Sequence, residues 1–401
     1  MKNARVVLSL SVLALVAIGF LVLASAGTKV GLDNHHDSLF FLKQQAKWLA
    51  LSIPLLVGAI MFDYRKWRES KWLTVAMYVA VVLALCAVFG FRPVNGSRRW
   101  LMFGPVRIQP SEFAKIAVVI AMAVFLDKVG WRIELFWKGA LLALGIIAVP
   151  AALAVLEPDF GSTMLIAVSG GVLLVVGGMR LLHLLILGGS GALFVGGLLI
   201  SNGNRMRRIA SWMPDSLKVT LSEWCPWLGD LTVSTADAEE ANHQLNHALF
   251  AIQHGGTTGV GFCNSMQKQR YLPENHTDFI FAIGAEEWGI AFSLLLLALF
   301  VTLFICGVII AAKSQDRLGR LMAFGMTFLL FFSALFNMGV VTGLLPTKGL
   351  ALPFISYGGT NLMTALIAIG VIINISRQDD LQRLQEKSKI SALLTNKQEE
   401  G

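Results

Sequence analysis

Long apolar stretches separated by short polar ones dominate the pattern of the chain. A helix that crosses a bilayer needs about 20 mostly apolar residues, because each residue adds only about 1.5 Å to its length. Ten stretches meet or nearly meet this requirement, although the fourth is short and the eighth is long. They cover about residues 5–26, 43–62, 72–90, 112–127, 138–156, 162–179, 181–200, 280–312, 319–344 and 360–376. The pattern predicts an all-α integral membrane protein with ten transmembrane helices.

The polar segments divide the chain into a predicted membrane domain and a tail. Residues 1–376 hold the ten stretches, and the charged residues 377–401 are predicted to form a cytoplasmic C-terminal tail. Residues 201–279 are predicted to form a large extracytoplasmic loop between helices 7 and 8, and loops of this size usually have a function. Its basic and apolar start, 204–213, suggests an interfacial helix. The glycines of 255–261 permit tight turns or close backbone approach to a ligand.

The first stretch could also be a signal peptide. Lys2 and Arg5 precede it and the small residues Ala24 to Ala26 follow it. Its apolar run is longer than the usual signal-peptide core, and nine further stretches follow. We therefore predict a retained first helix.

The basic residues predict the orientation, because short cytoplasmic loops are enriched in Lys and Arg. With both termini inside, the outside connections 157–161 and 345–359 carry only Lys348, and most basic residues fall inside. The outside connection 91–111 breaks the rule, since it carries four arginines, among them Arg98 and Arg99. It is either a tolerated exception or an anion site, and the planar guanidinium suits phosphate.

Composition agrees with a membrane protein and argues against other classes. The chain is 55% hydrophobic and only 14% charged, whereas a soluble protein carries far more charge. The net charge of +8 does not indicate a nucleic-acid partner, because the basic residues lie mainly between apolar stretches. The four cysteines form no Cys-x-x-Cys pair, so no zinc or redox motif is indicated. Cys225 and Cys263 share the large loop, and a disulfide between them stays open.

Polar residues with candidate roles lie near two predicted helix starts and in one outside segment. Pro110 suits the first turn of the fourth helix, and Glu112 and Lys115, three residues apart, share a face. They are either a helix-start pair or a buried cation that Glu112 orients toward a cavity. Asp159, in a short outside turn, is predicted to cap the sixth helix. In the segment 345–359, Lys348 and Ser356 could contact a headgroup or could equally be structural.

A cluster of ionisable residues precedes the eighth helix. Glu274, His276 and Asp278 lie within five residues at the mouth of a very apolar stretch. Asp278 could simply cap that helix. Alternatively, a carboxylate beside an apolar wall could have a raised pKa and act as a general base. Spacing alone does not separate a polymerase from a lipid transporter.

These motifs resemble the SEDS family (shape, elongation, division and sporulation) over nearly the whole chain. The matching runs are Gly96-Ser-Arg-Arg-Trp100, Gln109-Pro-Ser-Glu-Phe-Ala-Lys115, Glu157-Pro-Asp-Phe-Gly161, the run from Asn264 to Ala282, Glu286-Glu-Trp-Gly289 and the run from Leu345 to Gly359. The Pro-Thr-Lys-Gly-Leu form and the Asn264-Ser-Met-Gln-Lys run look more like the FtsW branch than the RodA branch. Cys263 and Thr360-Asn361 depart from the usual family pattern.

The resemblance implies a membrane glycosyltransferase that polymerises lipid II into peptidoglycan strands on the outer face of the bacterial cytoplasmic membrane. It implies Asp278 as the catalytic base and Arg99, Glu112, Lys115 and Lys348 as functionally important residues. We further expect Arg98, Glu274, His276 and Ser356 to line the substrate site. No metal ligands are assigned, and a divalent cation (Mg²⁺ or Mn²⁺) is expected to bind jointly with the substrate pyrophosphate.

The resemblance also implies partners and a location. A class B penicillin-binding protein, other membrane proteins of the division machinery and a site at the division septum are expected. Two other functions stay open: a lipid II flippase, and a non-catalytic scaffold that activates a penicillin-binding protein.

Overall fold

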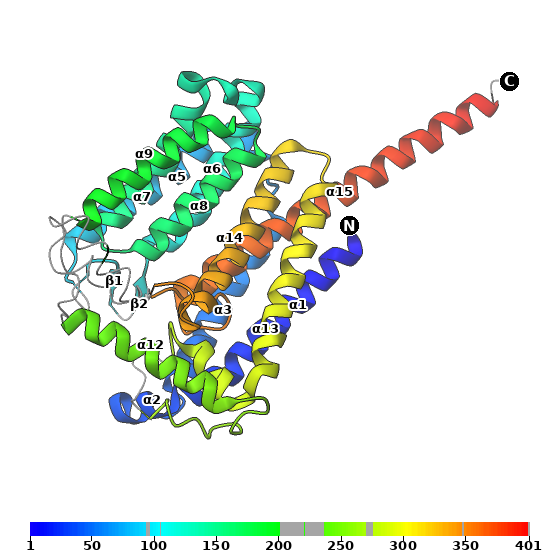
Figure 1. The fold of residues 1–401 in the computed structure, drawn as a ribbon. Helices are drawn as coiled ribbons and strands as arrows, with labels where there is room; N and C mark the ends of the chain where they lie inside the picture. Colours follow the sequence, from blue (N-terminus) through cyan, green and yellow to red (C-terminus); the bar gives the residue numbers. More distant parts are fainter. Residues whose placement is uncertain are drawn as a thin grey trace.

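The fold is a bundle of long helices that run side by side (Figure 1). The computed structural model describes residues 1–93, 97–104, 106–200, 220, 236–269, 276–346 and 349–399. Each of the ten predicted apolar stretches overlaps one long helix. These helices are α1 (Lys2–Ala26), α3 (Phe40–Met61), α5 (Lys71–Ala87), α6 (Pro110–Val129), α7 (Leu141–Leu156), α8 (Phe160–Val176), α9 (Leu181–Ile200), α13 (Ile280–Lys313), α14 (Arg317–Val341) and α15 (Gly359–Glu399).

The remaining elements lie between these ten helices, and all of them are short except α12, which has 20 residues. They are α2 (Thr28–His35), α4 (Lys66–Glu69), η1 (Val88–Gly90), η2 (Gly130–Glu134), η3 (Phe136–Ala140), α12 (Ala236–Gly255), β1 (Leu101–Phe103) and β2 (Val106–Ile108). The two strands pair antiparallel, with Leu101 opposite Ile108. This hairpin corrects the all-α expectation in the arginine-bearing connection, where Gly104, with φ of +60°, allows a tight turn. The suggested interfacial helix 204–213 lies outside the described residues.

Large exposed apolar side chains distinguish this bundle from a water-soluble one. Leu13, Met61 and Leu83 are each more than 60% exposed on three different helices, and apolar surface on this scale requires a lipid environment. Among the described residues, five helices are long and apolar enough to cross a membrane, and α7 and α8 are shorter apolar helices. The protein is therefore a multi-pass membrane protein, while the count of ten crossings stays a prediction.

The helix α6 lies at the centre of the bundle. Fifteen of its residues are buried, whereas α5 buries only Thr74 and Leu85. Pro110 begins α6, as predicted, because its missing N–H is not needed in a first helical turn. The start of α6 is therefore enclosed by protein, and its polar residues are held away from lipid.

The helix α13 is broken near its start, and a glycine-rich segment fills the break. Gly289 has φ of +71° inside α13. The amide of Ile290 donates to the carbonyl of Gly256 at 3.0 Å, and residues 260–261 donate to carbonyls of residues 286–287. A Cβ on Gly259 would lie 2.2 Å from the carbonyl oxygen of Glu287. The glycines of 255–261 thus allow the backbone to approach closely, and in this structure it approaches α13.

The last helix differs from the predicted boundary. α15 runs without a break from Gly359 to Glu399, past the expected end of the apolar stretch at residue 376, and extends beyond the bundle toward the C-terminus (Figure 1). The polar residues after 376 continue the helix because they include good helix formers and no proline.

Candidate functional site

Asp278 lies two residues before the first residue of α13 and is half-buried. Its main-chain carbonyl accepts a hydrogen bond from the Nδ2 of Asn337 in α14 at 2.8 Å, and the same nitrogen donates to the carbonyl of Leu350 at 2.5 Å. The carboxylate lies directly against Gly349, because a Cβ built there would be 2.4 Å from Oδ2 of Asp278. Asn337 thus ties the main chain at Asp278 to the segment that begins at Gly349, and the carboxylate lies beside that glycine.

The segment 349–358 packs against residues 276–278. The hydroxyl of Ser356 donates to the carbonyl of Thr277 at 2.6 Å and accepts from the amide of Leu352 at 2.8 Å. Gln45 of α3 bonds to the same segment, because its Nε2 donates to the carbonyl of Ser356 at 3.2 Å and its Oε1 accepts from the amide of Gly358 at 3.3 Å. Ser356 is 2% exposed, so its hydroxyl already serves the loop, and a contact with substrate stays a prediction.

The other two ionisable residues of the cluster are placed differently. The His276 carbonyl accepts from the amide of Tyr357 at 3.0 Å. Its ring lies 4.2 Å from the Phe41 ring and 5.8 Å from the Tyr357 ring, measured between centroids. His276 therefore joins an aromatic group beside Asp278. Glu274 and Lys348 lie outside the described residues.

Glu112 and Lys115 form a buried ion pair in the first turns of α6. The Lys115 ammonium lies 2.7 Å from Oε1 of Glu112, and the two residues are 5% and 6% exposed. Oε2 of Glu112 accepts from Asn361 at 3.2 Å and from Thr364 at 3.4 Å, both in α15. A buried charge pair needs such additional hydrogen bonds to offset its desolvation, and α15 supplies them.

Arg99 and the turn between α7 and α8 meet at the same end of the bundle. Arg99 donates from Nε to the carbonyl of Glu157 at 3.3 Å and from Nη2 to the carbonyl of Pro158 at 2.5 Å. A guanidinium has five N–H donors, so the others can still bind an anion. Arg98 is exposed and donates to the carbonyl of Phe89 at 2.8 Å. The structure thus separates the two arginines, and Arg99 is the one that is anchored.

Asp159 links this turn to the start of α6. Its Oδ1 accepts from the amide of Ser162 at 3.2 Å, which confirms the predicted cap of α8. Its Oδ2 accepts from Ser111 at 2.9 Å and from Gln109 at 3.0 Å, and the amide of Gln109 donates to Thr360 at 3.3 Å. Hydrogen bonds therefore connect the Arg99 turn, the start of α6 and the start of α15.

Glu157 is a buried carboxyl that the sequence analysis read only as part of a turn. It is 0% exposed, and neither carboxylate oxygen has a hydrogen-bond partner among the described residues. Burial raises the pKa of Glu157 to about 8, the neighbouring Asp159 adds to the rise and Arg99 opposes it. The sequence signal that could have identified Glu157 is its position two residues before Asp159, the predicted helix cap.

A second buried network follows Asp278 by two helical turns. Glu287 accepts from the Lys268 ammonium at 3.3 Å and from the Ser25 hydroxyl of α1. Glu286 accepts from the Met266 amide at 3.1 Å and lies 2.9 Å from Nδ1 of His254 in α12. Both glutamates are 0% exposed. Through these contacts, the two glutamates of α13 bind residues 266–268, Ser25 of α1 and His254 of α12. Two carboxylates in an apolar stretch indicate a functional or structural site, but the sequence analysis used Glu286 and Glu287 only as part of a family motif.

Metal-ligating residues do not cluster in the part of the chain that the structure describes. It contains no group of three or more His, Cys, Asp or Glu side chains placed to hold a metal ion. These residues do not fit a dedicated protein-bound metal, so no step below is assigned to one. Cys263 is exposed, and Cys225, its proposed disulfide partner, lies outside the described residues.

Fold and site together define a class: a multi-pass, mainly helical membrane protein with a carboxylate, an ion pair and an anchored arginine gathered at one end of its bundle. The family described as "Cell cycle protein", which comprises FtsW, RodA and SpoVE, matches residues 5–381. The chain belongs to this family.

Relatives and a solved structure agree with this assignment. The chain is 34% identical over 373 residues to the "Probable peptidoglycan glycosyltransferase FtsW" of Geobacter metallireducens, covering 92% of this chain and 94% of that protein. It is 35% identical over 366 residues to "Stage V sporulation protein E" of Bacillus subtilis, covering 91% and 94%. A chain described under "Structural coordination of polymerization and crosslinking by a peptidoglycan synthase complex" matches with a TM-score of 0.71 and 26% identity, covering 93% and 97%.

Proposed function

We propose that the protein is a peptidoglycan glycosyltransferase that polymerises lipid II into glycan strands, for cell division. Membership of the FtsW, RodA and SpoVE family and the names of its relatives support this function. The observation that carries it is Asp278, whose main-chain carbonyl is bonded by Asn337 and whose carboxylate lies against Gly349, at the end of the bundle that also holds Arg99 and Lys115.

Asp278 acts as the general base of the reaction. Its carboxylate removes the proton from the 4-hydroxyl of the GlcNAc unit of an incoming lipid II. The oxygen forms a bond to the anomeric carbon of the donor MurNAc, and the bond from that carbon to the polyprenyl pyrophosphate breaks with inversion. Glycosidases use two carboxyl groups, but pyrophosphate is already a stable anion, so one base suffices.

Cationic side chains stabilise the leaving pyrophosphate. Arg99 keeps free donors while two of them hold the turn at residues 157–158. Lys115 contributes a fixed positive group beside Glu112, and Lys348 is proposed to add another from the segment next to Gly349. Fixed charges contribute most where a charge develops in a site that excludes water. A divalent cation, Mg²⁺ or Mn²⁺, is proposed to bind jointly with the pyrophosphate, where it would supply additional positive charge.

The proposed topology places this site outside the cytoplasm. Ten crossings with both termini inside, a membrane domain of residues 1–376, a cytoplasmic tail of 377–401 and an outside loop at 201–279 agree with the distribution of Lys and Arg. Trp72, Trp131 and Trp137 support one interface, because they lie at the same ends of neighbouring helices and are each more than 70% exposed.

A class B penicillin-binding protein is the proposed partner. The matching solved chain comes from a peptidoglycan synthase complex whose description names polymerization and crosslinking. Crosslinking is the work of a transpeptidase, so a partner of that class suits this fold. Other membrane proteins of the division machinery and a location at the septum complete the proposal.

A direct test uses the purified protein with its transpeptidase partner, labelled lipid II and Mg²⁺ or Mn²⁺. Wild type should make glycan chains, and Asp278→Ala should make essentially none. Asp37→Ala is the control, because Asp37 is a surface carboxylate that pairs with Lys43. Equal glycan yield from wild type and Asp278→Ala would favour a scaffold, and transport of lipid II without polymer would favour a flippase.

A further inference from the structure

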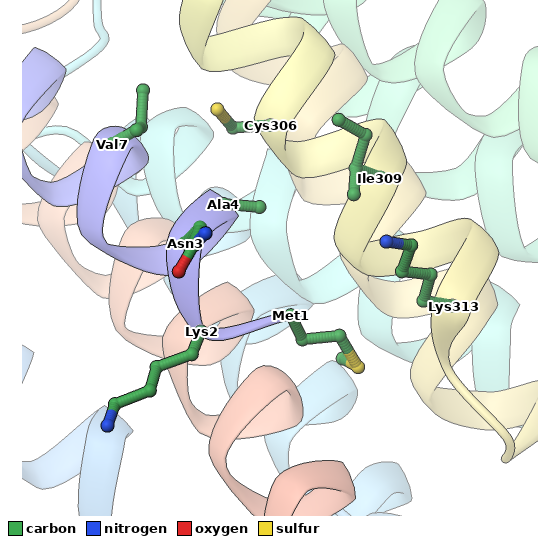
Figure 2. A pocket seen from close by; sticks show the side chains of 8 residues that line it. All are labelled: Met1, Lys2, Asn3, Ala4, Val7, Cys306, Ile309 and Lys313. Atoms are coloured by element: carbon green, nitrogen blue, oxygen red, sulfur yellow. The ribbon is translucent and has the colours of Figure 1, made fainter.

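A groove lies between the first turn of α1 and the last turns of α13, at the end of α13 opposite Asp278 (Figure 2). Its volume is about 460 Å³, and its lining includes Lys2, Ala4, Val7, Cys306 and Lys313. The function proposed above uses none of these residues. The groove combines an apolar wall with basic residues, and it is located at a helix end, where membrane and water meet.

The basic residues of the groove carry uncompensated charge. Arg5 pairs with Asp380 at 3.2 Å, and Arg383 donates to the carbonyl of Lys313 at 2.6 Å. These contacts occupy the neighbouring guanidinium groups. Lys2 and Lys313 are exposed, and neither ammonium has an acidic partner among the described residues. No acidic residue lines the groove, so its field attracts an anion.

The two lysines are placed on opposite sides of the groove. Figure 2 shows the Lys313 ammonium directed toward the space between the helices, while Lys2 points outward from the first turn of α1. Long lysine side chains reach a polar boundary while their stems lie along apolar surface. Lys313 is therefore directed at a ligand in the groove, and Lys2 adds positive charge at the same end of α1.

The apolar wall continues from the groove along the lipid-facing surface. Val7 of the groove is 41% exposed, and Val6 and Leu10 of α1 and Ile305 of α13 are each more than 50% exposed. A ligand with a phosphate and hydrocarbon chains would thus find cations at the groove and apolar contacts beside it. A free phosphate would contact only the cations.

We propose that this groove binds an anionic glycerophospholipid, with the headgroup phosphate at the Lys313 ammonium, in the positive field to which Lys2 adds from the start of α1, and an acyl chain along Val7 and the exposed faces of α1 and α13. Basic pockets between transmembrane helices bind anionic headgroups, and each lysine near an anionic lipid surface contributes substantially. The proposal is independent of the glycosyltransferase function, because it uses the other end of α13.

The test titrates the full-length protein in mild detergent with phosphatidylglycerol and counts bound lipids by native mass spectrometry. Lys2→Gln with Lys313→Gln should weaken binding about 30-fold. The matched control is Lys66→Gln with Lys71→Gln, which removes the same charge from two other exposed lysines and should change binding less than twofold. Phosphatidylcholine with the same chains should bind at least tenfold more weakly than phosphatidylglycerol.

Three results would overturn the proposal: equal loss in both lysine pairs, equal binding of the two lipids, or displacement of phosphatidylglycerol by millimolar inorganic phosphate. Ala4→Trp provides a second variant, because Ala4 lines the groove and a larger side chain fills it. It should reduce phosphatidylglycerol binding while the melting temperature in phosphatidylcholine stays unchanged. Undiminished binding by a folded Ala4→Trp protein would also contradict the placement in the groove.

Discussion

Gly349→Ala should move the proposed catalytic carboxylate while sparing the fold. A Cβ at Gly349 would lie 2.4 Å from Oδ2 of Asp278, whereas ordinary van der Waals contact begins at 3.4 Å. The atom that has to yield is the end of a side chain rather than backbone. Alanine therefore displaces the carboxylate by about 1 Å.

The size of the effect follows from that displacement. A misplacement of about 1 Å at a reacting group can reduce the rate about 100-fold, which corresponds to about 2.7 kcal/mol of transition-state stabilisation. The loss should appear in the turnover of lipid II, with KM changed less than threefold, because Gly349 touches the base. The melting temperature should stay within about 2 °C of wild type.

The assay is glycan synthesis from labelled lipid II, with Gly358→Ala as the matched control. Gly358 lies in the same segment, and a Cβ there would meet its neighbour at an ordinary 3.5 Å. The double variant Gly349→Ala with Asp278→Ala should be no slower than Asp278→Ala alone, because the two changes act on one group. Full activity of Gly349→Ala, or an additive loss in the double variant, would refute the reasoning.

Three further predictions concern buried polar groups. Glu157→Gln should stabilise the protein increasingly as pH rises from about 4.5 to about 8, by roughly 3 to 5 kcal/mol above that range. The reason is that the Glu157 carboxyl ionises at lower pH in the unfolded chain than in the folded protein, so the wild type loses stability over this range. A melting-temperature difference that does not change with pH would contradict this. Asn337→Ala should lower the free energy of unfolding by about 2 to 5 kcal/mol, since it leaves the carbonyls of Asp278 and Leu350 without this donor; an unchanged denaturation midpoint would be inconsistent with that role. Lys268→Met should cost about 3 to 5 kcal/mol because Glu287 then stays buried and unpaired. Adding Glu287→Gln should recover part of the loss in the same thermal assay, and no recovery would argue against the pairing.

The apolar pattern allowed the helices to be predicted, but the contacts between them could not be. Among the described residues, each of the ten predicted stretches overlaps a long helix, because hydrophobic length is a local property. The hairpin at 101–108 was missed, since its three-residue strands are too short to show an alternating pattern. The end of α15 was misplaced because a polar sequence can continue a helix beyond the membrane.

Two local contacts of the candidate site were predicted from the sequence, but its contacts between distant segments were not. Glu112 and Lys115 pair as their spacing suggested, and the Asp159 cap is confirmed. The role of Asn337 depends on Asp278, which is far away in sequence, and no local pattern shows such a contact. The proposed roles of Asp278, Lys348 and the other substrate residues stay predictions until the variants are measured.

α15 gives the protein a straight connection between its two ends. Asn361 and Thr364 contact Glu112 near one end, Asn374 bonds to the carbonyl of Ile60 at 2.7 Å, and Arg383 holds the end of α13. At about 1.5 Å per residue, the helix extends about 20 Å from Asn361 to Asn374 and about 38 Å from there to Glu399. If Asn374 is the fulcrum, a tilt that moves the Glu112 contacts by a given amount moves the far end of the helix about twice as far. The helix would then act as a lever, and its longer part, from Asn374 to Glu399, lies on the side away from Glu112 and Asp278.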